Sequence, residues 1–320
     1  MTRLPRHVSI VIFSVSILAN ILMAGYLFFS PRRTLPISKK ESQANFQYLA
    51  PRIFAENQND VLINFIELRT KLQTYVTPIP DRIGVFFEYL PSGTSIGINE
   101  KQEYLVASLL KVPVAMAAYE SIIEGKLKED TVLTLDKSHL DPYFGALWQE
   151  GPGYQLTLSD AIQRMLKQSD NTAARVIFDK LPPGAVENIF DQLDIPKVIN
   201  ESQPVVTPKN YASILKSLYL SSILPKEESQ KLLTILTQTD FNDRIVAGIP
   251  QGVPVAHKIG FHTYPNLNQS IYTDCGIVYP PSRPFILCIM VQSSEERALL
   301  YMKDISRMVY TYVTSYEKNK

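Results

Sequence analysis

The segment from Val106 to Glu120 reads VASLLKVPVAMAAYE and places a hydroxyl and an amine three residues apart where an apolar helical pattern begins. At this spacing, the side chains of Ser108 and Lys111 share one face of a helix. A serine hydroxyl is a weak nucleophile until a base takes its proton, and a buried lysine with a lowered pKa can serve as that base. The pair predicts a nucleophilic serine, although Ser213–Lys216 and Ser315–Lys318 show the same S-x-x-K pattern.

Two further motifs follow the first pair in a fixed order. Ser169-Asp170-Asn171 falls in a break between helical patterns, and Lys258-Ile259-Gly260 ends a strand pattern. S-x-x-K, S-D-N and K-T-G in this order mark class A β-lactamases and penicillin-binding proteins, and the chain resembles this family from about Pro80 to Met308. No S-D-N follows Ser213 or Ser315, so we assign both to solvated helix faces.

The resemblance implies a role for each residue of the first two motifs. Ser108 would be the acylated nucleophile, and Lys111 would be the amine that activates it. Ser169 would pass a proton to the leaving nitrogen, while Asn171 would hold the amide side chain of the substrate and also Lys111. This set of roles predicts a serine hydrolase that needs neither a metal nor a cofactor.

The third motif would complete the site on the strand side. By the same resemblance, Lys258 would lower the pKa of Lys111 and attract a substrate carboxylate. The backbone N–H groups of Ser108 and Phe261 would form the oxyanion hole beside Gly260, and such preorganised donors stabilise a developing oxyanion. Gly260 and Phe261 are therefore expected to bind substrate.

The chain departs from the family pattern at two places. Ile259 stands where the family has Thr or Ser, so we expect weaker recognition of a substrate carboxylate. The stretch between Asn171 and Thr207 is short, and its acid Glu201 lacks the matching downstream Asn of a deacylation loop. We therefore expect acylation to be intact and release of the acyl group to be slow.

Strand patterns at both ends of the folded region enclose a central block of helical patterns from Val106 to Gln238. Because hairpins connect the strands, we expect one α/β domain over residues 58–316, with a five-stranded antiparallel sheet flanked by helices and a mostly helical subdomain, as the β-lactamase-like resemblance implies. The flanking helices are expected at 60–76 and 295–316, and the strands at 82–89, 94–98, 255–259, 271–279 and 285–291.

The first residues predict a membrane anchor. Val8–Phe29 contains 22 residues without a charge, enough to cross a bilayer as a helix. We expect an anchor over residues 1–32 and a tether over residues 33–57, with a cleaved signal peptide as the alternative. Positive charges flank the segment on both sides, so they do not fix the orientation. Substrates of the family lie outside the bacterial cytoplasmic membrane, which places the domain on the extracytoplasmic side.

Composition and minor motifs exclude several other classes. Lys plus Arg is 32 and Asp plus Glu is 31, a net charge of +1, so the chain has no overall basic footprint for nucleic acid. His257 and His262 flank the lysine motif without usual metal-ligand spacing, so no metal is expected. Gly93–Gly97 matches G-x-S-x-G but lies within the predicted hairpin, where it is expected to form a turn.

The two cysteines lie almost symmetrically about the turn at residues 280–284. In an antiparallel hairpin Cys275 and Cys288 could form a bridge only if the register makes them a direct pair. The alternative is two unbridged cysteines buried on one face of the sheet, which we favour because cross-strand bridges are geometrically demanding.

These features predict a membrane-anchored serine hydrolase that is acylated at Ser108 by a β-lactam or a related amide. Two alternatives remain. One is a penicillin-binding DD-peptidase or transpeptidase that acts on peptidoglycan peptides, and the other is a catalytically silent domain that binds the cell wall, as Ile259 and the short loop would allow.

Overall fold

The computed structural model describes Tyr48 and residues 63–196, 204–263 and 269–315. The predicted membrane span over residues 8–29 and the acid Glu201 lie outside the described residues. Within those residues, no helix combines the length and the apolar character needed to cross a membrane.

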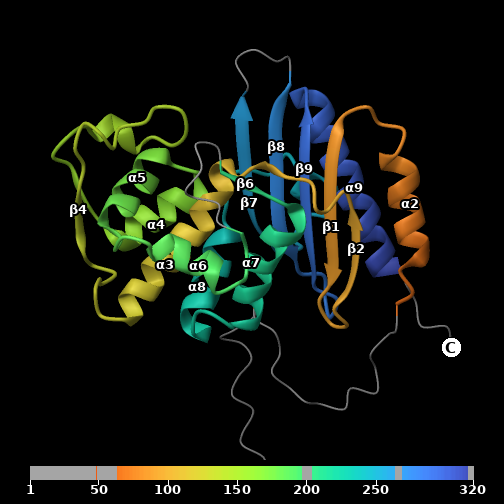
Figure 1. The fold of residues 1–320 in the computed structure, drawn as a ribbon, viewed down its shortest axis with the longest axis horizontal. Coiled ribbons are helices and arrows are strands. Elements are labelled where there is room, and N and C mark those ends of the chain that lie inside the picture. The colour runs from red at the N-terminus through yellow and green to blue at the C-terminus, as the bar shows by residue number, and fades with distance from the viewer. Residues whose placement is uncertain (1–47, 49–62, 197–203, 264–268, 316–320) are drawn as a thin grey trace, which may run out of the picture. The chain divides into compact units, whose positions relative to one another are not determined.

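A five-stranded antiparallel sheet forms the centre of the domain, as predicted (Figure 1). The strand order is β2-β1-β9-β8-β7, so the N-terminal hairpin pairs with the last strand of the chain and β7 lies at an edge. The strands are β1 (Arg82–Tyr89), β2 (Thr94–Ile98), β7 (Val255–Thr263), β8 (Ser270–Val278) and β9 (Phe285–Ser293).

The sheet is covered on both faces, which explains why its inner strands are buried along almost their whole length. Helices α2 (Ile66–Val76) and α9 (Glu295–Ser315) pack against one face, where Val85 and Phe87 of β1 are buried (Figure 1). On the other face, Phe86 of the same strand packs against the helical part of the domain. Alternate residues of a strand point to opposite faces, so β1 is buried on both sides.

The helical part supplies the other core and carries most of the candidate site. Helix α7 packs across β1, β8 and β9, and its Tyr211 and Leu215 are fully buried. The α-helices of this part are α3 (Lys111–Ile123), α4 (Leu158–Lys167), α5 (Asn171–Lys180), α6 (Ala185–Asp191), α7 (Pro208–Leu220) and α8 (Lys226–Leu236). The 3₁₀ turns are η2 (Ala107–Leu110), η3 (Leu147–Glu150) and η4 (Val246–Gly248).

Three local features differ from the sequence-based expectation. Helix α2 begins at Ile66 and not near residue 60; its N-cap, Phe65, makes no side-chain cap, and the Asn64 side chain before it accepts the Ile66 N–H at 3.0 Å. Two small ribbons were not predicted, because strands of two or three residues are too short to show a period. They pair β3 (Tyr104–Leu105) with β6 (Val205–Val206), and β4 (Val132–Thr134) with β5 (Gln155–Thr157).

One residue of the predicted tether packs on the domain. Tyr48 is 8% exposed, its ring lies 4.9 Å from that of Tyr279, and its carbonyl accepts the Tyr279 hydroxyl at 3.0 Å. Its backbone N–H donates to Gln230 Oε1 at 3.1 Å. The domain therefore includes a contact well before residue 58.

The favoured prediction of two unbridged cysteines is wrong. Cys275 of β8 and Cys288 of β9 are direct partners in the strand register and form a disulfide, with Cα atoms 3.9 Å apart. Both residues are fully buried on the face of the sheet that packs against the helical part. The register, which hydrophobic pattern alone left open, is what makes the bridge possible.

We expect the bridge to be present in the purified protein. Alkylation of the denatured, unreduced full chain should modify no thiol, and alkylation after reduction should modify two, as counted by intact mass. Recovery of two modified thiols without reduction would contradict the disulfide. The double variant Cys275→Ala/Cys288→Ala should be less stable by about 2–4 kcal/mol in urea unfolding, because a disulfide constrains the unfolded chain.

Candidate active site

The nucleophile candidate lies in the turn that leads into α3. Ser108 belongs to η2 and is half-buried, and the Lys111 side chain donates from Nζ to Ser108 Oγ at 3.1 Å. Ala107, directly before the serine, has φ of +45°, which a residue other than glycine adopts at a cost. The backbone is therefore held in an unfavourable conformation at the position that presents the hydroxyl.

Lys111 is held by four acceptors, three of them from the junction between α4 and α5. Its Nζ lies 2.5 Å from the backbone O of Ser169, 3.1 Å from Ser169 Oγ and 2.6 Å from Asn171 Oδ1, in addition to the contact with Ser108. The side chain is 6% exposed. Burial lowers the pKa of Lys111 to about 8, although the charges of Asp170 and Asp141 oppose this. Lys111 can therefore act as a base near neutral pH.

The S-D-N motif forms the turn that delivers these acceptors. Ser169 follows the C-cap of α4 with φ of +55°, at a position that usually carries glycine. Asp170 is the N-cap of α5, and its carboxylate accepts the N–H groups of Ala173 at 2.8 Å and Leu147 at 2.9 Å. A Cβ on Gly145 would lie 2.0 Å from Asp170 Oδ2, so only glycine fits beside this cap.

Lys258 enters the site from β7. It is fully buried, and its Nζ donates to Ser169 Oγ at 2.8 Å and to the Ile259 carbonyl at 3.1 Å. Burial lowers the pKa of Lys258 well below its usual value, and the charges of Lys111 and Arg244 lower it further. Burial is the largest cause of the lowered pKa of both lysines, and the two amines share Ser169 Oγ as a hydrogen-bond partner.

The remaining residues of the third motif lie along the edge strand. A Cβ on Gly260 would meet Thr273 Oγ1 at 2.4 Å and Leu109 Cγ at 3.4 Å, so glycine lets η2 approach β7. Phe261 is half-buried, and its ring lies 5.1 Å from that of Tyr272 on β8. Alternate N–H groups of an edge strand have no strand partner, which leaves donors along β7 on the side of η2. Ile259 is 2% exposed.

The sequence reasoning missed the charged residues on the helical side that hold Asn171 in place. Asp141 accepts from Asn171 Nδ2 at 3.1 Å and from Arg175 Nη2 at 2.5 Å, which fixes the amide of Asn171 with its oxygen toward Lys111. Burial raises the pKa of Asp141, but these hydrogen bonds and the charge of Arg175 hold it below its usual range. No motif or periodicity marks Asp141 in the sequence.

A similar group supports the sheet side. Arg244 is 6% exposed, and its Nη1 donates to the carbonyls of Gly260 and Thr273, both at 2.8 Å. Asp274 is fully buried and lies 2.8 Å from His257 Nδ1. His257, which flanks the lysine motif, is therefore part of a buried pair behind Lys258. The segment that contains Arg244 resembles the family, but nothing in the sequence alone assigns this contact.

The structure separates Ser108 from its sequence rivals. Ser213 Oγ donates to the Lys209 carbonyl at 3.4 Å, and Lys216 forms an ion pair with Glu88 at 2.5 Å, so the two do not form a nucleophile–base pair. Ser213 and Lys216 are half-buried, so the helix face that we expected to be solvated is only partly exposed. Gly93–Gly97 forms the turn and the start of β2, as predicted, and not a strand–elbow–helix unit.

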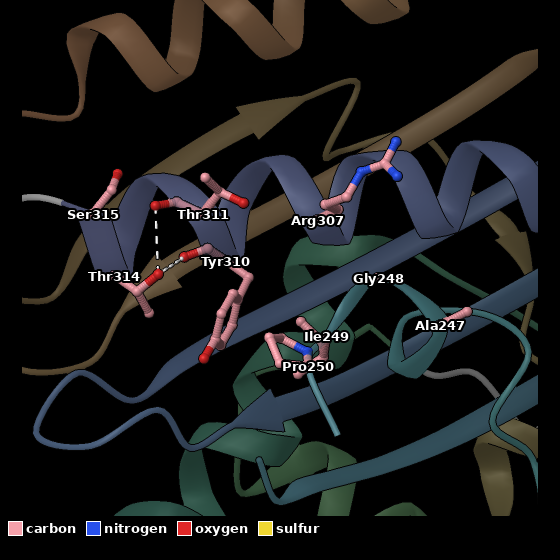
Figure 2. A pocket seen from close by; sticks show the side chains of 9 residues that line it. All are labelled: Ala247, Gly248, Ile249, Pro250, Arg307, Tyr310, Thr311, Thr314 and Ser315. Atoms are coloured by element: carbon pink, nitrogen blue, oxygen red, sulfur yellow. Dashed lines mark hydrogen bonds between the residues drawn. The ribbon is translucent and has the colours of Figure 1, made fainter. Parts of the chain in front are cut away.

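A groove of about 440 Å³ lies elsewhere, between α9 and the segment Ala247–Pro250 (Figure 2). Tyr310 points toward Ile249 and Pro250, and Thr314 Oγ1 bonds the Tyr310 carbonyl of its own helix at 2.8 Å. None of the motif residues lines this groove. It offers no activated nucleophile, so the site around Ser108 remains the candidate.

A serine hydroxyl that forms a hydrogen bond with a buried amine, in a domain with this sheet order, is typical of serine hydrolases. A model of the Beta-lactamase enzyme family matches residues 67–313, and the chain belongs to this family. It is a β-lactamase-like serine hydrolase that acts on amide bonds.

Known proteins of this kind cover most of the chain. Beta-lactamase 3 of Bacillus cereus is 25% identical over 234 residues, which span 68% of this chain and 71% of that protein. The structure of PBP-A, at 24% identity, covers 78% of this chain and 97% of its own, with a TM-score of 0.72. A β-lactamase from Sphaerobacter thermophilus, at 19% identity, covers 80% and 100% with a TM-score of 0.70. The two solved structures support the fold.

Gly145→Ala should destabilise the domain by about 2–3 kcal/mol, because the new Cβ strains the backbone and displaces the Asp170 cap. Urea unfolding measures the change. Gly184→Ala is the matched control, since Gly184 also has a positive φ but no atom within 4 Å of a new Cβ, and it should lose about 1 kcal/mol. Equal losses of unfolding free energy in the two variants would show that the close approach of Gly145 to the Asp170 carboxylate does not matter for stability.

Proposed function

We propose that β-lactams, or related amides of the cell wall, acylate this protein at Ser108. The observation that carries the proposal is the 3.1 Å contact between Ser108 Oγ and the amine of Lys111, whose pKa burial lowers to about 8. The names of the relatives support a β-lactam as acyl donor. A variant of PBP-A was solved as an acyl-enzyme complex with penicillin G, which agrees with this chemistry.

Acylation proceeds by proton transfers among these groups. Neutral Lys111 takes the Ser108 proton as Oγ attacks the carbonyl carbon, and a tetrahedral oxyanion forms. The C–N bond then breaks, and the leaving nitrogen receives a proton from Ser169 Oγ. Ser169 in turn recovers a proton from Lys111, whose Nζ lies 3.1 Å away. The product is an ester on Ser108 and a free amine.

Binding groups surround this step. The backbone N–H groups of Ser108 and Phe261 bind the oxyanion, a role that the edge position of β7 supports. Asn171 Oδ1 already accepts from Lys111 at 2.6 Å, so its place beside the nucleophile suits contact with a substrate amide. Lys258 keeps Ser169 Oγ oriented between the two amines.

Release of the acyl group is slow in this proposal, because the chain lacks the glutamate pattern of a deacylation loop and Glu201 has no matching downstream Asn. A penicillin-binding DD-peptidase or transpeptidase is the second candidate. The likeness to the fold of PBP-A favours it, since such an enzyme shares the acylation residues and differs in the acceptor.

We further propose that residues 8–29 anchor the chain in the bacterial cytoplasmic membrane, with the domain on the extracytoplasmic side. The uncharged length of this segment supports the anchor. The Cys275–Cys288 disulfide supports the external side, because such bonds persist in oxidising compartments.

Intact mass spectrometry of the full chain with benzylpenicillin tests the function. We expect one adduct on the wild type that forms within minutes and persists much longer than one catalytic cycle of a fast hydrolase. We expect no adduct on Ser108→Ala. Ser213→Ala, which alters the same sequence pattern outside the site, is the control and should acylate normally.

An adduct on Ser108→Ala would refute the nucleophile assignment. Rapid turnover that Glu201→Gln abolishes would refute slow release, and no reaction of the wild type would favour a silent binding domain.

The acylation rate should rise with pH and level off above about 8, because only neutral Lys111 accepts the proton and its fraction falls about tenfold per pH unit below its pKa. In Lys258→Ala we expect a slower reaction, because Ser169 Oγ loses a donor that orients it, with the midpoint moved by less than about half a unit, because burial is the largest cause of the lowered Lys111 pKa. Acylation rates between pH 5 and 10 measure this. An upward shift of more than about one unit would show that a charged Lys258 sets the pKa of Lys111.

A further inference from the structure

Two residues of α5, one helical turn apart, reach the same carboxylate beside the candidate site. Asn171 and Arg175 are four positions apart, so they share a face of the helix. Asn171 Nδ2 donates to Asp141 Oδ1 at 3.1 Å, and Arg175 Nη2 donates to Asp141 Oδ2 at 2.5 Å. The Asp141 side chain is 7% exposed, so its carboxylate is buried between these two donors.

The loop that carries Asp141 is also tied to α5 through its backbone. The Asp141 N–H donates to Thr172 Oγ1 at 2.9 Å, and Arg175 Nη1 donates to the Leu140 carbonyl at 3.2 Å. The Tyr143 N–H donates to Asp141 Oδ1 at 3.0 Å. Several bonds would have to break before this carboxylate could turn away from α5, so Asp141 has a fixed place.

Asn171 connects this carboxylate to the proposed base. Its Oδ1 accepts from Lys111 Nζ at 2.6 Å, while its Nδ2 donates to Asp141. An ionised carboxylate only accepts hydrogen bonds and an ammonium only donates them, so the amide between them has one favourable orientation. Nδ2 carries a second N–H, and this orientation leaves that N–H to donate to a carbonyl of a substrate.

The same arrangement determines the charge around Lys111. The negative charges of Asp170, at the N-cap of α5, and of Asp141 favour the protonated amine and oppose the lowering of the Lys111 pKa by burial. Lys258 on β7 is the cation that shares Ser169 Oγ with Lys111. Helices α4, α6 and α8 also pack against α3, but within the described ranges they bring no charge of comparable effect.

We propose that Asp141, held by Arg175, is a positioning residue for acylation: it fixes the direction of the Asn171 amide and places one partly compensated negative charge beside the base. The inference rests on the proposed acylation of Ser108. Asp141 and Arg175 act through Asn171 and Lys111, and because their charges are opposite, their removal should shift the protonation of Lys111 in opposite directions. A pair that only held the loop would leave the pH profile of acylation in place.

The pH profiles of single variants of the full chain test the charge. In Asp141→Asn the midpoint of the acylation rate should fall by about half to one unit, because loss of the negative charge favours neutral Lys111. In Arg175→Gln it should rise by at least about 0.3 unit, because the charge of Asp141 is then uncompensated. Arg175→Lys keeps the cation and should stay within about 0.2 unit of the wild type. Shifts of the same sign in Asp141→Asn and Arg175→Gln, or no shift, would overturn the inference.

The direction of the Asn171 amide has a separate readout. Benzylpenicillin carries an amide side chain, and 6-aminopenicillanic acid lacks it. In Asp141→Asn the half-saturating concentration of benzylpenicillin should rise about threefold to tenfold, because the second N–H of Asn171 is no longer presented in one direction. That of 6-aminopenicillanic acid should change less than about twofold. Equal changes for the two compounds would contradict the role in orienting Asn171.

The ion pair between Arg297 and Asp81 is the matched control. Arg297 Nη2 lies 3.2 Å from Asp81 Oδ1, and the two side chains are 46% and 2% exposed, against 50% and 7% for Arg175 and Asp141. This pair joins α9 to the residue before β1 and takes no part in the candidate site. Asp81→Asn and Arg297→Gln should keep the midpoint within about 0.2 unit of the wild type. Shifts as large as those at Asp141 and Arg175 would refute a local effect.

Titration of Lys111 itself separates this inference from the proposed function. Carbon NMR of the full chain, with lysine labelled at Cε and the signal assigned by Lys111→Met, reports protonation whether or not a penicillin reacts. Opposite shifts in Asp141→Asn and Arg175→Gln without acylation would support the inference and refute the proposed function. Unchanged titration beside normal acylation would do the reverse. If Asp141→Asn does not fold, the half-exposed Arg175 still decides, because a titration midpoint that falls or stays in Arg175→Gln overturns the inference.

Discussion

Two buried amines share one hydroxyl, and this contact is the constraint on which the site depends. Ser169 Oγ lies 3.1 Å from Lys111 Nζ and 2.8 Å from Lys258 Nζ. Desolvating an ammonium costs several kcal/mol unless hydrogen bonds compensate, and two such charges also repel. Hydrogen-bond acceptors therefore surround both amines, and burial lowers the pKa of Lys111 and of Lys258. The burial that disfavours the charged lysines is what makes Lys111 a base near neutral pH.

Ser169 has a strained backbone conformation that holds its hydroxyl in place. The position after α4 has a left-handed conformation that glycine would adopt freely, but glycine has no hydroxyl to put between the amines. The strain at Ser169, of roughly 1–2 kcal/mol, is offset by the Asp170 cap, which in turn requires Gly145. The conformation at Ser169 thus accounts for two other residues, Asp170 and Gly145.

The sequence predicted the elements of the fold better than their arrangement. Long strands and α9 carry clear apolar patterns, so their positions followed from periodicity. The pairing of the N-terminal hairpin with β9 depends on packing across the whole chain, which no local pattern records. The same holds for the register that joins Cys275 to Cys288, and for Tyr48, whose partner Tyr279 lies far along the chain.

The residues of the candidate site also fall into those that the sequence located and those that it missed. Ordered motifs located Ser108, Lys111, Ser169, Asn171 and Lys258, and the structure brings these five together through hydrogen bonds. Asp141 and Arg244 escaped because they act through tertiary contacts, and such contacts leave no spacing in the sequence.

The sheet order also separates the groups for chemistry from the groups for recognition. Strand β7 is an edge strand, so one side of it is open to the turn that carries Ser108. The proposed nucleophile, base and proton relay come from the helical part, whereas Ile259 and Phe261 come from this strand. A substitution at Ile259 can therefore change which substrate is held without removing the hydrogen bonds among Ser108, Lys111 and Ser169. The replacement of a hydroxyl by Ile259, beside an intact Ser108–Lys111–Ser169 arrangement, is a change of this kind.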